Sequence, residues 1–303
     1  MILKIEEKEF LNYGRCVFLS NGILDVAVSI DIGPRILFLG FHGEKNVMFC
    51  DLKRDYIISR VKDSPAFYYY GGHRLWISPE PSEGFLPDNS PVVYSILPDS
   101  VSFLPPKQKG TEIKAGMEII LGEDASDIMI IHTAKNCAKA PRTFGLWPAT
   151  MLKTGGTVIL PQNTDGTEPL SPNREIAFWP GSDIRDPRVF FGNRFLTIRC
   201  EKDGSPLKIG VNNVLGWAAY VGKEYTVMKR FVHTSRAAYP DFGSSCEVAV
   251  QKDFTEIESL SPLYRVEPGD SIRHVENISL SRTKNSVDPL DENGIARYIE
   301  NLS

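Results

Sequence analysis

Short segments in which apolar and polar residues alternate recur along most of the chain. From Leu24 to Asp31 every second residue is apolar, which is the period of a half-buried β-strand. A Gly33-Pro34 turn separates this segment from Arg35–Leu39, and we expect the two to form a hairpin. Further strands, bounded by turn signals, are expected at Thr111–Leu121, Asp127–Cys137, Phe195–Cys200, Trp217–Val221, Tyr225–Val232, Cys246–Gln251 and Thr255–Leu260.

The period of a helix is clear at the C-terminal end. Ile295, Tyr298, Ile299 and Leu302 are spaced as i, i+3, i+4 and i+7, which predicts a short amphipathic helix. Many strands with almost no helices between them favour an antiparallel sandwich or barrel over a parallel α/β fold. No repeat or linker divides the sequence. We therefore expect residues 1–303 to form one all-β domain, a large antiparallel β-sandwich with a short C-terminal helix.

The composition is that of an ordinary soluble globular protein, with 42% hydrophobic and 24% charged residues. The net charge of −4 gives no reason to expect nucleic acid or an anionic membrane as a partner. The opening residues MILKIEEKEF lack the pattern of a signal peptide, and no apolar run is long enough to span a bilayer. The five cysteines are scattered without a C-x-x-C pair, which favours free thiols and a cytoplasmic location.

Several kinds of catalytic site are not indicated. The chain lacks the glycine-rich phosphate-binding motifs G-x-G-x-x-G and G-x-x-x-x-G-K-[ST], and it lacks the hydrolase motif G-x-S-x-G. No two histidines have the close spacing of a metal site on one strand or helix. The histidines are His42, His73, His132, His233 and His274. We therefore expect neither a metal centre nor a cofactor.

A dense cluster of aromatic and basic residues lies at Tyr68–Trp76. The pair Gly71-Gly72 lets the backbone turn sharply or approach another group closely, and His73, Arg74 and Trp76 follow it. Indole faces stack on the C–H surface of a sugar ring, and a guanidinium donates hydrogen bonds to hydroxyls. A glycine turn with core aromatics would explain each residue alone, but the density of the cluster favours a binding site.

Two further segments carry polar and aromatic residues that suit a sugar. Arg142–Thr150 contains Trp147, and Phe254–Leu263 contains two glutamates. On a strand, Glu256 and Glu258 point to the same face because they are two residues apart. Burial between apolar strands would raise the pKa of such a carboxyl toward that of a useful base.

These segments resemble the galactose mutarotase-like (aldose 1-epimerase-like) superfamily. The matching stretches run from about Asp31 to about Leu280, and YGGHRLW resembles an uncharacterised bacterial branch. They include IDIGPRILFLGF, YGGHRLWISPE, TFGLWPAT, GGTVILPQ and EIESLSPL. The resemblance implies a β-sandwich with a concave sugar-binding face. It also implies interconversion of the α and β anomers of an aldose by general acid–base catalysis, without a cofactor.

The resemblance further implies roles for individual residues. A carboxylate takes the proton of the anomeric hydroxyl, and Glu258 matches that base, with Glu256 as its substitute. A histidine protonates the ring oxygen, and His73 matches that acid. Active members have a second histidine near the position of Trp147, and an indole cannot transfer a proton. His132 or His233 would have to supply that group.

We expect one concave pocket to contain the residues of all three segments. The expected pocket residues are His73, Arg74, Trp76, Trp147 and Glu258, and the expected sugar-binding residues are Arg74, Trp76, Trp147, Glu256 and Lys229. An alternative is a sugar receptor without catalysis, in which the same carboxylates only accept hydrogen bonds. A glycoside hydrolase or lyase is a third hypothesis, and hydrolysis would need two carboxylates on opposite sides of a cleft. A small-molecule sugar is the expected partner in each case.

Overall fold

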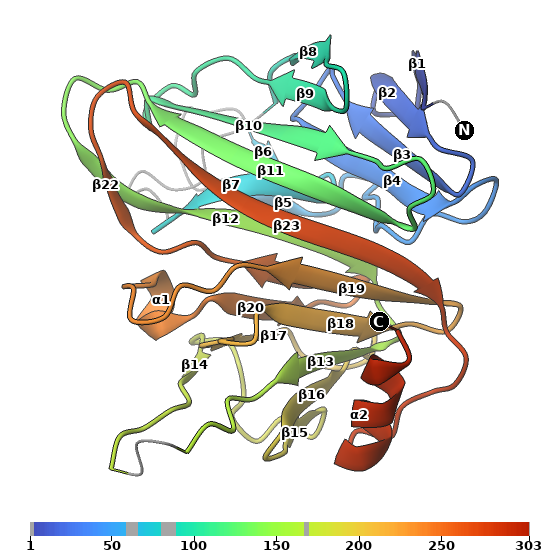
Figure 1. Cartoon of the computed structure of the whole chain (residues 1–303), viewed down its shortest axis with the longest axis vertical. Helices are drawn as coiled ribbons and strands as arrows, with labels where there is room; N and C mark the ends of the chain where they lie inside the picture. Colours follow the sequence, from blue (N-terminus) through green and yellow to red (C-terminus); the bar gives the residue numbers. More distant parts are fainter. Residues whose placement is uncertain (1–2, 59–65, 80–88, 167–169, 303) are drawn as a thin grey trace.

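Two large antiparallel sheets packed face to face make up most of the protein (Figure 1). This architecture comes from a computed structural model, which describes residues 3–58, 66–79, 89–166 and 170–302. The expected antiparallel β-sandwich is confirmed. No helix in these ranges is long and apolar enough to cross a membrane.

The first sheet has eleven strands and carries the three motif segments on neighbouring strands. Its order is β1 (Lys4–Glu9), β2 (Arg15–Ser20), β3 (Leu24–Ser29), β4 (Arg35–Phe41), β7 (His73–Ser78), β12 (Arg142–Lys153), β21 (Phe254–Ser259), β20 (Cys246–Val250), β17 (Leu207–Val211) and β14 (Ile176–Phe178), and β22 (Tyr264–Val266) pairs with β12. β7, β12 and β21 are therefore adjacent, although they lie far apart in the sequence.

The second sheet has ten strands. Its order is β15 (Val189–Phe191), β16 (Phe195–Arg199), β13 (Thr157–Pro161), β18 (Trp217–Val221), β19 (Tyr225–Phe231), β23 (Ser271–Arg282), β11 (Asp127–Asn136), β10 (Ile113–Ile120), β9 (Val101–Leu104) and β8 (Val93–Ile96). β5 (Ile57–Ile58) and β6 (Phe67–Tyr68) form a small separate pair, and α1 (Pro240–Gly243) is a single turn.

The alternation of the sequence places an apolar core between the sheets. Leu24, Val26 and Val28 of β3 are fully buried, and they belong to a cluster that draws side chains from both sheets. The predicted hairpin is confirmed, since β3 and β4 pair antiparallel across the Gly33-Pro34 turn. At the other end of the chain, α2 (Glu292–Glu300) forms where the helical period predicts it and packs its apolar face on the second sheet.

The long strand β12 is not among the strands that alternation predicts. Eight of its twelve residues are buried, on both faces, so the two faces do not alternate in polarity. Gly145 and Pro148 within it also resemble strand breakers. A central strand of this kind is recognised only when its neighbours on both sides are known.

Candidate active site

The two faces of β7 separate the residues of the YGGHRLW motif. Arg74 and Trp76 point to the face of the first sheet that is turned away from the second sheet, where they line a cavity. His73 points the other way and contacts His132 of the second sheet. Successive residues of a strand alternate in this manner.

The two glycines that precede His73 have a structural function. Gly71 and Gly72 both have positive φ angles, +95° and +75°. A Cβ atom on Gly72 would lie 2.3 Å from the carbonyl oxygen of Ile36, and one on Gly71 would lie 2.2 Å from that of Phe49. Because glycine has no Cβ, the backbone before β7 can pack directly against the backbone at Ile36 and Phe49.

A cavity of about 330 Å³ lies on the outer face of β7, β12, β21 and β17. Ligand pockets of this kind begin at about this size. Its walls combine six aromatic rings with two basic residues and two carboxyls. Among the described residues the aromatic and charged lining consists of Phe67, Tyr69, Arg74, Trp76, Trp147, Trp179, Lys208, Phe254, Glu256 and Glu258. Five predicted residues, Arg74, Trp76, Trp147, Glu256 and Glu258, thus line one cavity, while their roles stay predictions.

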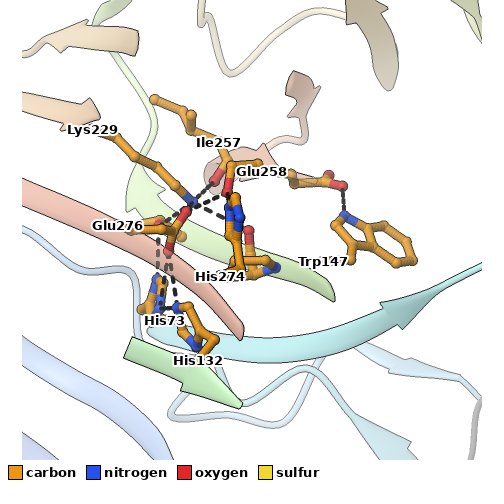
Figure 2. Close-up of polar contacts among 11 residues, drawn as sticks. His73, His132, Trp147, Lys229, Ile257, Glu258, His274 and Glu276 are labelled. Atoms are coloured by element: carbon orange, nitrogen blue, oxygen red, sulfur yellow. Dashed lines mark hydrogen bonds and ion pairs between the residues drawn. The ribbon is translucent and has the colours of Figure 1, made fainter. Parts of the chain in front are cut away.

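Glu258 is held at one of its two oxygens. Its Oε2 accepts a hydrogen bond from the indole nitrogen of Trp147 and another from Lys208 Nζ at 2.9 Å (Figure 2 shows the Trp147 contact). No bond to Oε1 is found within the described part of the chain. Lys208 also pairs with Glu247 at 2.7 Å, and its ammonium lies 4.6 Å from the Trp147 ring centre and 4.7 Å from that of Trp179.

The carboxyls around Lys208 differ in protonation. Burial, and then the charge of Glu258, raise the pKa of Glu256 to about 8, so this carboxyl keeps its proton at neutral pH. Burial also raises the pKa of Glu247 well above its usual range. Burial alone would lower the pKa of Lys208, but the charges of Glu258 and Glu247 outweigh it and raise that pKa. The cavity therefore presents a protonated carboxyl beside a carboxylate paired with a cation.

Arg74 makes cation–π contacts with two aromatic rings. Its guanidinium carbon lies 4.5 Å from the centre of the Trp76 ring and 4.6 Å from that of Phe67. Cation–π contacts of this length fix the orientation of a guanidinium at the wall of a cavity. Its N–H groups are then presented in a defined direction.

The prediction that His73 shares the pocket with Glu258 is wrong. His73 is fully buried between the sheets, and Figure 2 shows it within a cluster separate from the Glu258–Trp147 pair. The reason is the alternation of β7, because His73 precedes Arg74, which faces the cavity. His132 belongs to the same buried cluster, and His233 bonds Ser245 Oγ at 3.0 Å. No histidine among the described residues lines the cavity.

Lys229 is likewise misplaced by the sequence prediction. It is 1% exposed and lies between the sheets, where its Nζ is 2.8 Å from Glu276 Oε1. It therefore makes no contact with the space in which a sugar is expected. The cluster around it also includes His274 and Ser259, which hydrogen-bond to each other at 2.7 Å.

The buried cluster is balanced in charge. Burial lowers the pKa of His73 well below its usual value and that of His274 to about 4, so these imidazoles are neutral. Burial alone would raise the pKa of Glu276, but the charge of Lys229 and the bond from His132 hold it well below its usual range. The Lys229–Glu276 ion pair thus lies beside two neutral imidazoles, those of His73 and His274.

Three atoms of this cluster have the identity and proximity of metal ligands. His132 Nε2 lies 3.2 Å from His73 Nε2 and 3.0 Å from Glu276 Oε2, and the remaining distance is 3.6 Å. Two imidazoles and a carboxylate suit transition metals. Lys229 already neutralises Glu276, however, so a divalent cation would leave two positive charges in excess in a fully buried space. Such charge is costly to bury, and the cluster is better explained as an ion pair with its hydrogen bonds.

Sequence reasoning missed Lys208, Trp179 and Glu247. Lys208 lies on β17, outside the three segments that the sequence analysis singled out. The feature by which it could have been recognised is a lysine that stands between buried residues on the short strand β17. Only the pairing of β17 with β20, beside β21, brings it to Glu258.

Comparison with known proteins supports the fold and no more. No protein-family profile and no curated protein match the sequence. A TPR-domain containing protein from Parabacteroides distasonis superposes with a TM-score of 0.62 at 14% identity over 91% of this chain, which spans about half (48%) of that protein. A galactose mutarotase-like protein from Lactobacillus casei gives 0.58 at 10% identity, with 88% of this chain and 100% of that one covered. A candidate aldose 1-epimerase from Escherichia coli gives 0.56 at 12%, with 93% and 100% covered.

The fold of this protein is therefore the galactose mutarotase-like β-sandwich. At identities of 10–14% this likeness concerns the fold alone. The activity has to be argued from the cavity.

Proposed function

We propose that this protein binds a small sugar in the cavity and interconverts its anomers, as an aldose 1-epimerase. The observation that carries the proposal is the pair of carboxyls in one aromatic-lined cavity, Glu258 paired with a cation and Glu256 protonated at neutral pH. Two carboxyls in different protonation states supply a base and an acid without a histidine. Glu256 thus takes the role that the sequence analysis gave to His73.

Each of the two carboxyls gives one proton and takes one proton in the proposed reaction. Glu258 accepts the proton of the anomeric hydroxyl while Glu256 donates its proton to the ring oxygen. The bond between the anomeric carbon and the ring oxygen breaks, and an open-chain aldehyde forms. After rotation of the aldehyde, the ring oxygen attacks its other face, Glu256 recovers its proton from that oxygen, and Glu258 returns a proton to the new hydroxyl. The two reacting oxygens share one carbon, so neighbouring groups on one strand face suit both transfers.

The remaining cavity residues support binding. Trp76, Trp147 and Trp179 offer flat apolar faces for the C–H surface of a pyranose. Lys208 keeps Glu258 in place through a 2.9 Å contact, which leaves Oε1 for the substrate. A sugar is the proposed partner, and a cytoplasmic location remains part of the proposal.

A receptor without catalysis is the second candidate. It is favoured by the two bonds that Glu258 Oε2 already accepts, from Trp147 and from Lys208. A carboxylate fixed in this way can accept a hydrogen bond from a sugar hydroxyl without taking its proton. The two candidates differ in whether bound sugar changes its anomer.

The test is polarimetry or NMR on freshly dissolved α-aldoses, with the spontaneous rate subtracted, together with calorimetric binding of the same sugars. We expect acceleration by the unmodified protein and a fall of about 10²- to 10⁴-fold for Glu258→Gln, which keeps the shape of the side chain but is not a base. His233→Asn, outside the cavity, is the control and should leave the rate unchanged. Binding without acceleration by the unmodified protein would establish the receptor instead.

A further inference from the structure

Lys229 crosses from the second sheet to the backbone of the first (Figure 2). Its Nζ donates to the carbonyl oxygen of Pro148 on β12 at 3.2 Å and to that of Ile257 on β21 at 3.0 Å. A third bond goes to Thr150 Oγ1 at 3.1 Å. A fully buried ammonium therefore ties together two strands of the sheet opposite its own.

These contacts fall where the hydrogen-bonded ladder between β12 and β21 ends. The register runs from Lys153–Phe254 to Ala149–Glu258 and stops before Pro148. Proline has no N–H and cannot donate to a ladder. Lys229 therefore supplies donors between the strands at the end of the ladder beside Glu258.

The two tethered residues are neighbours of the cavity residues. Ile257 lies between Glu256 and Glu258, and Pro148 follows Trp147. Each pair of neighbours points to opposite faces, so a bond to the backbone from behind the sheet fixes the side chains in front of it. The same ammonium is held by Glu276, which Ser259 and His132 also bond.

We propose that Lys229 is a positioning residue for the Glu256–Glu258 pair, acting on it through the backbone of β12 and β21. The inference rests on the proposed function. It gives Lys229 a role that requires no contact with the sugar. Loss of the tether should misplace the carboxyls, and a misplacement of about 1 Å can cost about 10²-fold in rate.

A second route from Lys229 to the site is electrostatic. Burial and the charge of Glu258 raise the pKa of Glu256, whereas the charges of Lys208, Arg74 and Lys229 lower it. The charged and titratable groups around Glu256 are Glu258 on its own strand, Arg74 on β7, Lys208 on β17, Lys229 on β19 and Tyr69 before β7. Removal of the lysine charge alone should therefore raise the pKa of Glu256, whereas removal of the whole Lys229–Glu276 pair takes away two opposite charges and should change it little.

The test replaces the lysine together with its partner, because loss of one alone would leave an uncompensated buried charge. In Lys229→Met/Glu276→Gln we expect kcat to fall by about 10- to 100-fold with KM changed by less than about threefold. The basic limb of the pH–rate profile should stay in place, because two opposite charges leave together. His274→Asn changes the same buried layer without contacting Pro148 or Ile257, and it should keep the normal kcat and limb.

A second double variant keeps the test decisive if the first does not fold. Lys229→Gln/Glu276→Gln retains an amide donor for the carbonyl oxygens of Pro148 and Ile257, so its loss of kcat should be smaller. Such a rescue by a donor would not follow from loss of the ion pair alone. A folded Lys229→Met/Glu276→Gln protein with kcat within threefold of the unmodified protein would overturn the proposal. Carboxyl ¹³C NMR of Glu256 and Glu258 detects a changed environment of the two carboxyls without turnover, so an inactive unmodified protein would refute the proposed function and still leave Lys229 tested.

Discussion

Glu256→Gln should remove the basic limb of the pH–rate profile. With a pKa of about 8 the carboxyl is protonated to about nine-tenths at pH 7 and about one-tenth at pH 9. If Glu256 is the acid, kcat/KM of the unmodified protein should therefore fall about tenfold between these pH values. The glutamine variant keeps the shape and has no proton to lose, so its much lower rate should not decline over this range.

The assay is NMR or polarimetry of a non-ionising aldose from pH 5 to pH 10, with the spontaneous rate subtracted at each pH. The apparent pKa of kcat/KM belongs to the free protein and is the one to compare. A basic limb that persists at the same pH in Glu256→Gln would refute the assignment, because another group would then carry the proton. Glu258→Gln is the matched variant on the same strand face and should lower the rate at every pH.

The raised pKa of Glu256 should also make the free energy of unfolding depend on pH. Its folded pKa lies above the unfolded value of 4.5, so the folded state keeps a proton that the unfolded chain releases. The contribution is present below pH 4.5 and is lost as the pH rises toward 8, by at most roughly 1.4 kcal/mol per pH unit. Urea unfolding of Glu256→Gln at several pH values should lack this decline relative to the unmodified protein. Equal slopes in the two proteins would contradict a raised pKa.

Three further changes test the rest of the structure. Glu276→Gln strands the ammonium of Lys229 in the core and should cost about 3–5 kcal/mol in urea unfolding, most of it recovered when Lys229→Met is added; a loss below about 1 kcal/mol would contradict the ion pair. Trp179→Ala should weaken sugar binding about tenfold by calorimetry, and an unchanged Kd would remove this indole from the binding surface. Gly72→Ala should destabilise the fold by about 1–3 kcal/mol in thermal unfolding, since its Cβ would meet Ile36 at positive φ, and an unchanged Tm would contradict that close approach.

The strand pattern, the hairpin after Leu24 and the C-terminal helix follow from the sequence by itself. They depend on local periodicity, which places one face of each element in the core. The same local rule makes Glu256 and Glu258 co-facial and, applied to β7, separates His73 from Arg74. The latter consequence is present in the sequence, but motif resemblance grouped these two residues together.

Only the tertiary structure decided which faces meet. β7, β12, β21, β20 and β17 lie side by side in this order although most of them are far apart in the sequence, and this order brings Lys208 to Glu258. The pKa of Glu256 likewise depends on burial and on charges from other strands, which no local pattern encodes. The sequence could not place Lys229 in the core, because a lysine is seldom fully buried. It can lie between the sheets because Glu276, from another strand, neutralises it there.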